Sequence, residues 1–110
     1  MKIRDVLEML SASVVCGSDS GVYEGVYVGD LLSRAMSHVQ CDNLWITIMS
    51  NINVIAVATL TEPAAILLAE GVVLQEDALA SAKENGITVL TSPLSAYEIC
   101  TRLGRMEQGI

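Results

Sequence analysis

The feature that most constrains the fold is an uninterrupted apolar run at residues 64–69. The run reads Ala-Ala-Ile-Leu-Leu-Ala, with a proline before it and Glu-Gly after it. Six consecutive apolar residues between turn signals indicate a strand that is buried on both faces, as in a parallel sheet with a helix layer on each side. The β-rich runs at residues 44–49 and 87–91 indicate two more interior strands. The chain therefore has to supply helices for two faces of a sheet.

Helical patterns alternate with these strands. Apolar residues at helical spacing predict a first helix near residues 3–10, and residues 75–85 predict a helix with an acidic start and an Asn-Gly stop. Ser92 is predicted as the N-cap of the last helix and Pro93 as its first residue. The clearest helical stripe is opened by Gly29-Asp30 and consists of Val28, Leu31, Leu32, Ala35, Met36 and Val39.

Two segments are harder to assign. Residues 13–16 predict a first strand, and the glycine-rich residues 17–29 predict a turning excursion with a short strand at 22–27. Residues 53–60 fit a strand or a helix. We favour the helix, because it would end before Pro63 and would supply a crossover between parallel strands, whereas Thr-Glu-Pro lacks the Gly or Asn of a tight hairpin.

The order of these elements predicts the fold class. Strands that alternate with helices through short loops imply right-handed crossovers and an α/β, three-layer domain, with a mostly parallel sheet of about four strands between helices. A chain of 110 residues fits one such domain, so we assign residues 1–110 to a single unit. Ligand loops in these folds lie at the carboxyl ends of the strands.

Composition excludes several classes of partner. The net charge is −7 and the six basic residues are scattered, which argues against nucleic acid. No apolar run approaches the ~20 residues of a membrane span, and acidic residues interrupt the first ten positions, so we expect no signal peptide, no membrane and a cytoplasmic location. The hydrophobic share of 52% predicts apolar surface left over after one core is filled, and hence a homodimer.

Catalytic signatures are also missing. The sequence has no phosphate-binding loop, no dinucleotide fingerprint, no nucleophile elbow and no zinc-protease motif. Cys16, Cys41 and Cys100 are far apart, which argues against a disulfide framework and a zinc site, and His38 lies off the apolar stripe, towards solvent. We therefore predict no enzyme activity, no cofactor and no metal. The alternative is a small enzyme or a redox-responsive thiol protein that uses Cys16 near a strand end.

Small polar residues gather at the predicted carboxyl ends of the strands, and they form the candidate ligand site. Each has an ordinary interpretation as a helix cap, and we expect Asn51 or Asn53 to cap the helix at 53–60. The functional interpretation is that N–H groups at helix starts, aided by hydroxyls, hold a phosphate or carboxylate. The candidates are Ser50, Asn51, Asn53, Gly71, Thr91, Ser92 and Ser95.

Five segments in sequence order resemble the DRTGG domain family. They span nearly the whole chain and comprise residues 27–33, 44–48, 53–58, 64–68 and 91–98. Two positions depart from the family pattern: its Asp-Arg would fall near residues 50–52, and its Thr-Gly-Gly near residues 69–71, where only Gly71 is kept. The resemblance implies a helix after the second interior strand, in agreement with a helix at 53–60.

This resemblance implies a fold like the N-terminal domain of HPr kinase/phosphorylase. Family members occur as regulatory modules beside CBS domains in some pyrophosphatases or fused to phosphotransacetylase. The stand-alone type, which this sequence resembles, is often encoded near iron-hydrogenase subunits and histidine-kinase-like ATPases. The resemblance thus implies a regulatory or adaptor domain that binds a partner protein, of an iron-hydrogenase or signalling system, or a small anionic ligand such as an adenine nucleotide. It implies no kinase activity, because the kinase's phosphate-binding loop belongs to a different domain.

Overall fold

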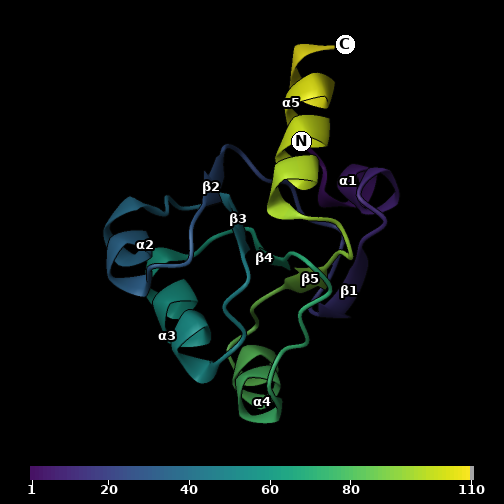
Figure 1. The fold of residues 1–110 in the computed structure, drawn as a ribbon. Coiled ribbons are helices and arrows are strands. Elements are labelled where there is room, and N and C mark those ends of the chain that lie inside the picture. Colours follow the sequence, from purple (N-terminus) through teal and green to yellow (C-terminus); the bar gives the residue numbers. More distant parts are fainter. Residues whose placement is uncertain (110) are drawn as a thin grey trace.

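The structure is a computed structural model that describes residues 1–109, and it confirms an α/β domain (Figure 1). One mostly parallel sheet has the strand order β1-β5-β4-β3-β2. Its strands are β1 (Ser13–Cys16), β2 (Val26–Val28), β3 (Leu44–Thr47), β4 (Ala65–Leu68) and β5 (Val89–Thr91). The helices are α1 (Ile3–Met9), α2 (Leu32–His38), α3 (Ile52–Thr61), α4 (Glu76–Glu84) and α5 (Ala96–Gln108).

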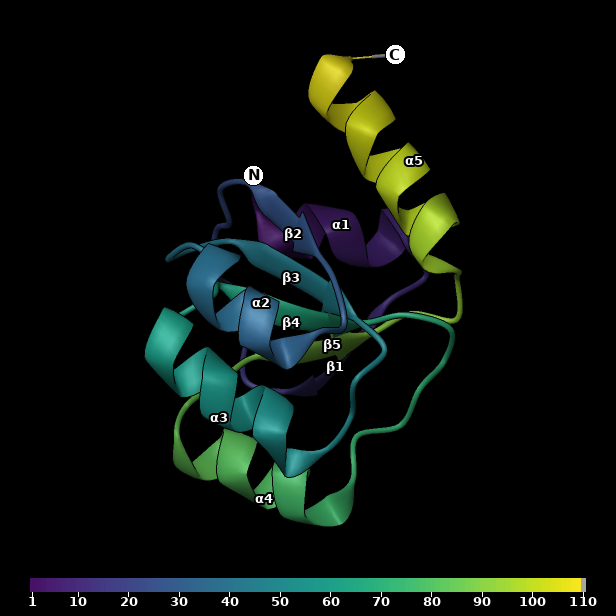
Figure 2. The ribbon, with the colours of Figure 1, turned by 60° about the vertical axis from the view of Figure 1, so that its left-hand side comes forward.

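The helices form two layers on the sheet. Figure 2 shows α2, α3 and α4 side by side on one face, and α1 and α5 on the other, with the end of α5 extending past the sheet. The apolar run at residues 64–69 supplies both cores: Ile66 and Leu68 pack with α2, α3 and α4, whereas Ala65 and Leu67 pack with α1 and α5. All four side chains are fully or almost fully buried, as alternation along a central strand requires.

Strand pairing is parallel everywhere except at one edge. β2, β3, β4 and β5 pair in parallel, so their carboxyl ends share one edge of the sheet. β1 pairs antiparallel to β5, with Ser13 opposite Thr91 and an irregularity between Val14 and Cys16. This antiparallel edge brings the segment before β1 to the carboxyl ends of the other strands.

The ambiguous segment is helical. α3 begins at Ile52, and the side chain of Asn51 caps it by accepting a hydrogen bond from the N–H of Asn53 at 2.9 Å. The helix ends at Glu62, which has a left-handed backbone and directly precedes Pro63. The predictions of a helix here and of its stop before the proline are confirmed, and of the two predicted caps, Asn51 and Asn53, it is Asn51 that caps the helix.

Other boundaries differ from the predictions. The sheet has five strands, whereas about four were predicted. The short strand predicted at residues 22–27 is β2, which begins at Val26, so Val28 lies in this strand and not on the apolar stripe of α2. Asp30 does not open α2. Instead, its carboxylate accepts hydrogen bonds from the hydroxyl of Thr47 at 2.7 Å and from the N–H of Ile48 at 2.9 Å. Asp30 therefore connects the segment before α2 to the end of β3.

The last helix begins three residues later than predicted. Its N-cap is Ser95, whose hydroxyl accepts a hydrogen bond from the N–H of Glu98 at 3.1 Å. The Ser92–Pro93 assignment is wrong because the Ser92 hydroxyl binds the backbone of Leu10 and Leu94 and does not cap the helix. Among residues 1–109, no helix is both long enough and apolar enough to cross a bilayer.

Candidate functional site

The loops after β3, β4 and β5, which contain most of the predicted polar residues, are joined by backbone hydrogen bonds at one edge of the sheet. The N–H of Gln75 donates to the carbonyl of Ser50 at 3.0 Å, and the N–H of Gly71 donates to the carbonyl of Ser92 at 2.8 Å. Parallel strands bring these loops together because their carboxyl ends coincide. The edge therefore forms one connected surface.

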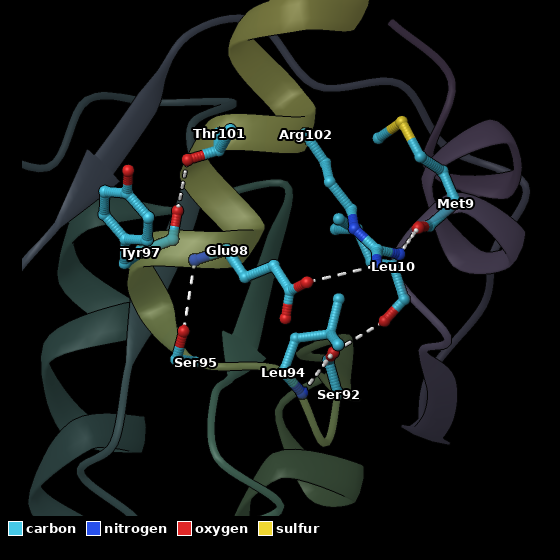
Figure 3. Close-up of polar contacts among 9 residues, drawn as sticks. All are labelled: Met9, Leu10, Ser92, Leu94, Ser95, Tyr97, Glu98, Thr101 and Arg102. Carbon is cyan, nitrogen blue, oxygen red and sulfur yellow. Dashed lines mark hydrogen bonds and ion pairs between the residues drawn. The ribbon is translucent and has the colours of Figure 1, made fainter.

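Several of the predicted residues use their side chains in hydrogen bonds to the backbone. The Ser92 hydroxyl is completely buried; it donates to the carbonyl of Leu10 at 2.6 Å and accepts from the N–H of Leu94 at 3.2 Å (Figure 3). Ser95 caps α5, as the same view shows, and Asn51 caps α3. These three side chains position loops, and we assign them no ligand contact.

Gly71 and Thr91 line a real hollow, with a volume of about 370 Å³. It lies between β1, the β4–α4 loop and the end of β5, and its volume falls in the range of ligand pockets. The Thr91 hydroxyl lies 3.4 Å from the carbonyl of Val72 across this space. The remaining lining residues are Ser11, Ser13, Val15, Val72, Val73, Leu74, Leu79 and Pro93.

The predicted ring is thus split between two places. Asn53 does not face the Gly71–Thr91 hollow; it lines a separate one, between α2 and α3. Ser50 and Asn51 lie outside both hollows, at the start of α3. Of the seven predicted residues, only Gly71 and Thr91 line the hollow at the end of β5, so the structure does not bring all seven together in one hollow.

The electrostatics of the hollow differ from those of a phosphate site. The N–H groups of Glu70 and Gly71 donate to carbonyls of the β5–α5 loop at 2.8 Å each, so neither is free for an anion. The first turn of α4 contains Glu76 and Asp77, which offset its positive helix end. Apolar side chains and three hydroxyls remain, an arrangement that suits an uncharged group with an apolar body.

Sequence comparison identifies the family. The DRTGG domain model matches residues 5–106 of the chain. The chain belongs to the DRTGG domain family. No curated protein sequence matches it.

One solved structure shares the fold. It contains the CBS and DRTGG domains of the regulatory region of a Clostridium perfringens pyrophosphatase, complexed with its activator, diadenosine tetraphosphate. The TM-score is 0.76 at 16% sequence identity, and the match covers 93% of this chain and 45% of that chain. At this identity the likeness shows the fold alone.

Sequence reasoning missed the contribution of β1 to the hollow. Ser11, Ser13 and Val15 enter it because β1 pairs antiparallel with β5, a partner more than 70 residues away in the chain. No local pattern indicates such a pairing.

The thiols of the DRTGG domain are poorly suited to redox chemistry. Cys16 is 7% exposed, its Sγ donates to the carbonyl of Ile87 at 3.4 Å, and burial raises the pKa of its thiol. Burial likewise raises the pKa of Cys100. Cys41 is exposed, but the negative charge of Asp42 raises its pKa. A reactive cysteine needs a lowered pKa, so this geometry argues against the alternative based on Cys16.

His38 is exposed, as predicted, and its ring has a hydrogen-bonding contact at Nδ1 and an aromatic neighbour. Nδ1 lies 3.0 Å from the carbonyl of Arg34 and 2.9 Å from the hydroxyl of Ser37, and the ring stacks on Tyr27 with centroids 6.4 Å apart. The Ser37 hydroxyl itself donates to the carbonyl of Arg34 at 3.1 Å, so both side chains are held against the backbone of α2. Within residues 1–109, no three His, Cys, Asp or Glu side chains gather as a metal site.

A larger hollow, of about 500 Å³, lies at the opposite edge of the sheet. Its lining includes Cys41, Asp42 and Glu62 beside the carboxyl end of α3. Its lining precedes β3, β4 and β5, so it lies at the amino ends of the parallel strands, whereas α/β sheets bind ligands at the carboxyl ends. We therefore place the candidate site at the carboxyl edge, although the hollow there is smaller.

Proposed function

We propose that this DRTGG domain is a non-catalytic regulatory module that works by binding, and that the hollow beside Gly71 and Thr91 is its ligand site. The observation that carries the proposal is the position of this hollow: it opens at the carboxyl ends of β4 and β5, where α/β sheets place their ligands. Its volume of about 370 Å³ and its apolar wall with three hydroxyls suit a small organic ligand.

An adenine nucleotide is the ligand class we favour, with the base and not the phosphates in the hollow. A purine base has apolar faces and a hydrogen-bonding edge, which matches the valine, leucine and hydroxyl side chains of the lining. The regulatory region with the same fold was solved with an adenine dinucleotide activator. The net charge of −7 and the acidic start of α4 oppose the phosphate groups.

A partner protein is the second candidate. Val73 projects from the rim of the hollow with 81% of its surface exposed, which is unusual for an aliphatic side chain. An apolar side chain of a partner, such as a subunit of an iron-hydrogenase or signalling system, would cover Val73 and fill the same space. In this case the domain acts as an adaptor.

Chemical-shift mapping with adenosine, AMP and ATP distinguishes the two candidates. If the base is recognised, amides around Val15, Gly71, Leu79 and Thr91 shift first, and adenosine binds at least as well as ATP at low salt. If phosphate recognition dominated, ATP would bind best and salt would weaken it. An absence of shifts at millimolar ligand would remove the nucleotide and leave the partner protein.

Two tryptophan variants on β1 supply the control. Ser13 lines the hollow, so Ser13→Trp should fill it and abolish the shifts. Val14 is the next residue on the same strand and is 38% exposed, but it is not part of the lining. Val14→Trp should leave binding unchanged, and equal loss in both variants would place the ligand elsewhere.

A further inference from the structure

α3 has no charged side chain on the side that faces solvent, where exposed aliphatic residues lie beside Asn53 and Thr59. It is the only helix within residues 1–109 that has no charged side chain. Val54, Ile55, Val57 and Ala58 are buried against the sheet, yet Leu60, on the outer side, is 69% exposed. An outer helix side that has exposed aliphatic residues and no charge is typical of a helix covered on both sides. In a single copy of the chain, only one side of α3 is covered.

The neighbouring helix extends this apolar surface. α2 contacts α3, and it exposes Met36 to 51%, while Leu31 at its N-cap is 66% exposed. Between the two helices lies a hollow of about 360 Å³, lined among others by Met36 and Leu32 of α2 and by Ala56 and Leu60 of α3. Leu31 and Met36 belong to the apolar stripe that the sequence predicts to face a core, and the core of one copy leaves both exposed.

The exposed side of α3 is symmetric about Ala56. Its exposed residues are Ile52, Asn53, Ala56, Thr59 and Leu60. Ile52 and Leu60 lie four residues before and after Ala56, and Asn53 and Thr59 lie three residues before and after it. A second α3 that runs antiparallel across Ala56 would thus set a large aliphatic side chain opposite another, and a small polar one opposite another. This is the self-complementarity that a two-fold interface requires.

The charges at the two ends of α3 favour the same antiparallel arrangement. The carboxylate of Glu62 lies just after the last turn, and the first turn contains no acidic residue. Antiparallel pairing about Ala56 brings each Glu62 to the level of Ser50, at the positive N-terminal end of the other α3. Because each copy has a net charge of −7, faces that carry acidic side chains repel one another, and the uncharged α3 is the surface where two copies can approach.

We propose that two copies of this chain associate through α2 and α3, with antiparallel α3 helices crossing at Ala56 on a two-fold axis. The small side chain at the crossing allows an interaxial distance near the lower end of the usual ~8–10 Å. Leu60 of each copy then covers the end of the other copy's hollow, near Leu32 and Asn53. The ligand hollow beside Gly71 lies apart from these residues, so this proposal does not depend on the proposed ligand.

Sedimentation velocity of the purified chain and two charge variants tests the interface. The wild-type chain should sediment as a dimer at micromolar concentrations. Ala56→Glu sets two carboxylates against each other at the axis and should weaken the dimer by at least about 30-fold. Ala56→Lys should do the same, whereas an equimolar mixture of the two variants should form a heterodimer, because opposite charges then meet at the axis.

The mixture is the decisive measurement, because a variant that merely misfolds cannot be rescued by its opposite. Val22→Glu is the control. Val22 is 62% exposed and is next in the chain to Tyr23, which belongs to the core on the α1 and α5 side of the sheet. The Val22→Glu variant should therefore remain a dimer. A monomeric wild-type chain would overturn the proposal. A dimer that survives Ala56→Glu would also overturn it, because the copies would then associate through another face. Leu60→Asp is a second, independent variant that should weaken the dimer.

Discussion

Replacement of Tyr23 by phenylalanine should stabilise the protein. Tyr23 is 2% exposed, and its hydroxyl is the one buried side-chain oxygen or nitrogen within residues 1–109 that has no hydrogen-bond partner. A buried polar group without a partner costs about 1–3 kcal/mol of folding free energy, because it loses its bonds to water. The ring itself packs in the core shared by α1 and α5, and phenylalanine keeps that ring. We therefore expect Tyr23→Phe to raise the free energy of unfolding at neutral pH by about 1 kcal/mol.

The same residue predicts a loss of stability at alkaline pH. Burial, and next the charge of Glu107, raise the pKa of Tyr23 from 10.0 to about 12. Above pH 10 the unfolded chain releases this proton while the native chain still holds it, so the unfolded state is favoured and stability falls up to the native pKa. A difference of two pKa units lowers the free energy of unfolding by about 3 kcal/mol once the pH exceeds both pKa values, since each unit contributes about 1.4 kcal/mol.

Urea unfolding at neutral pH and at several values between pH 10 and pH 12 measures both effects. The gain in Tyr23→Phe over wild type should grow steadily through that range, because the variant lacks the titrating group. Tyr97→Phe is the matched control: Tyr97 is 83% exposed, so its replacement should change little at neutral pH. A Tyr23→Phe variant that is less stable than wild type at neutral pH, or a gain that does not change with pH, would refute the reasoning.

Three further changes test the loops and the thiols. Ser92→Ala should lower the free energy of unfolding by about 1–3 kcal/mol, measured by urea unfolding, because it leaves a buried carbonyl at the end of α1 unpaired. Gly17→Ala should lower the thermal midpoint markedly, because Gly17 has φ +87° and a Cβ there would lie 2.6 Å from the Cα of Thr88. Asp42→Asn should speed alkylation of Cys41 at neutral pH, since it removes the charge that raises the thiol pKa, and an unchanged rate would contradict this cause.

The interior of the sheet was predictable from local pattern alone. The apolar run at residues 64–69 became a central strand because six apolar residues bounded by turn signals can be buried only from both sides. The helix at α3 was predicted against its β-branched composition, because proline at its end and the need for a crossover outweighed propensity. In both cases the decisive constraint lies within a few residues of the element.

Predictions failed where a distant partner decides the outcome. Ser92 and Pro93 have the residue types of a helix start, but the hydroxyl of Ser92 reaches Leu10, more than 80 residues away, and Ser95 then caps α5. Asp30 has the position of a first-turn acid, but its carboxylate binds the end of β3. Polar side chains that are short and versatile take the partner that the tertiary structure offers, and local sequence does not reveal this choice.

In the candidate site, too, the parts set by local pattern were predictable and the parts set by distant partners were not. Gly71 and Thr91 were predictable because strand ends in a parallel sheet converge, and this argument needs only the order of the elements. The chemistry of the site was not, because its wall is completed by Ser13 and Val15 from an antiparallel edge strand and by an apolar loop. These additions change the expected ligand from a phosphate group held by helix ends to an uncharged group held by an apolar wall. The choice between adenosine and ATP in the binding experiment is therefore a test of the edge strand's contribution, and a clear preference for ATP would mean that the helix ends, and not β1, define the site.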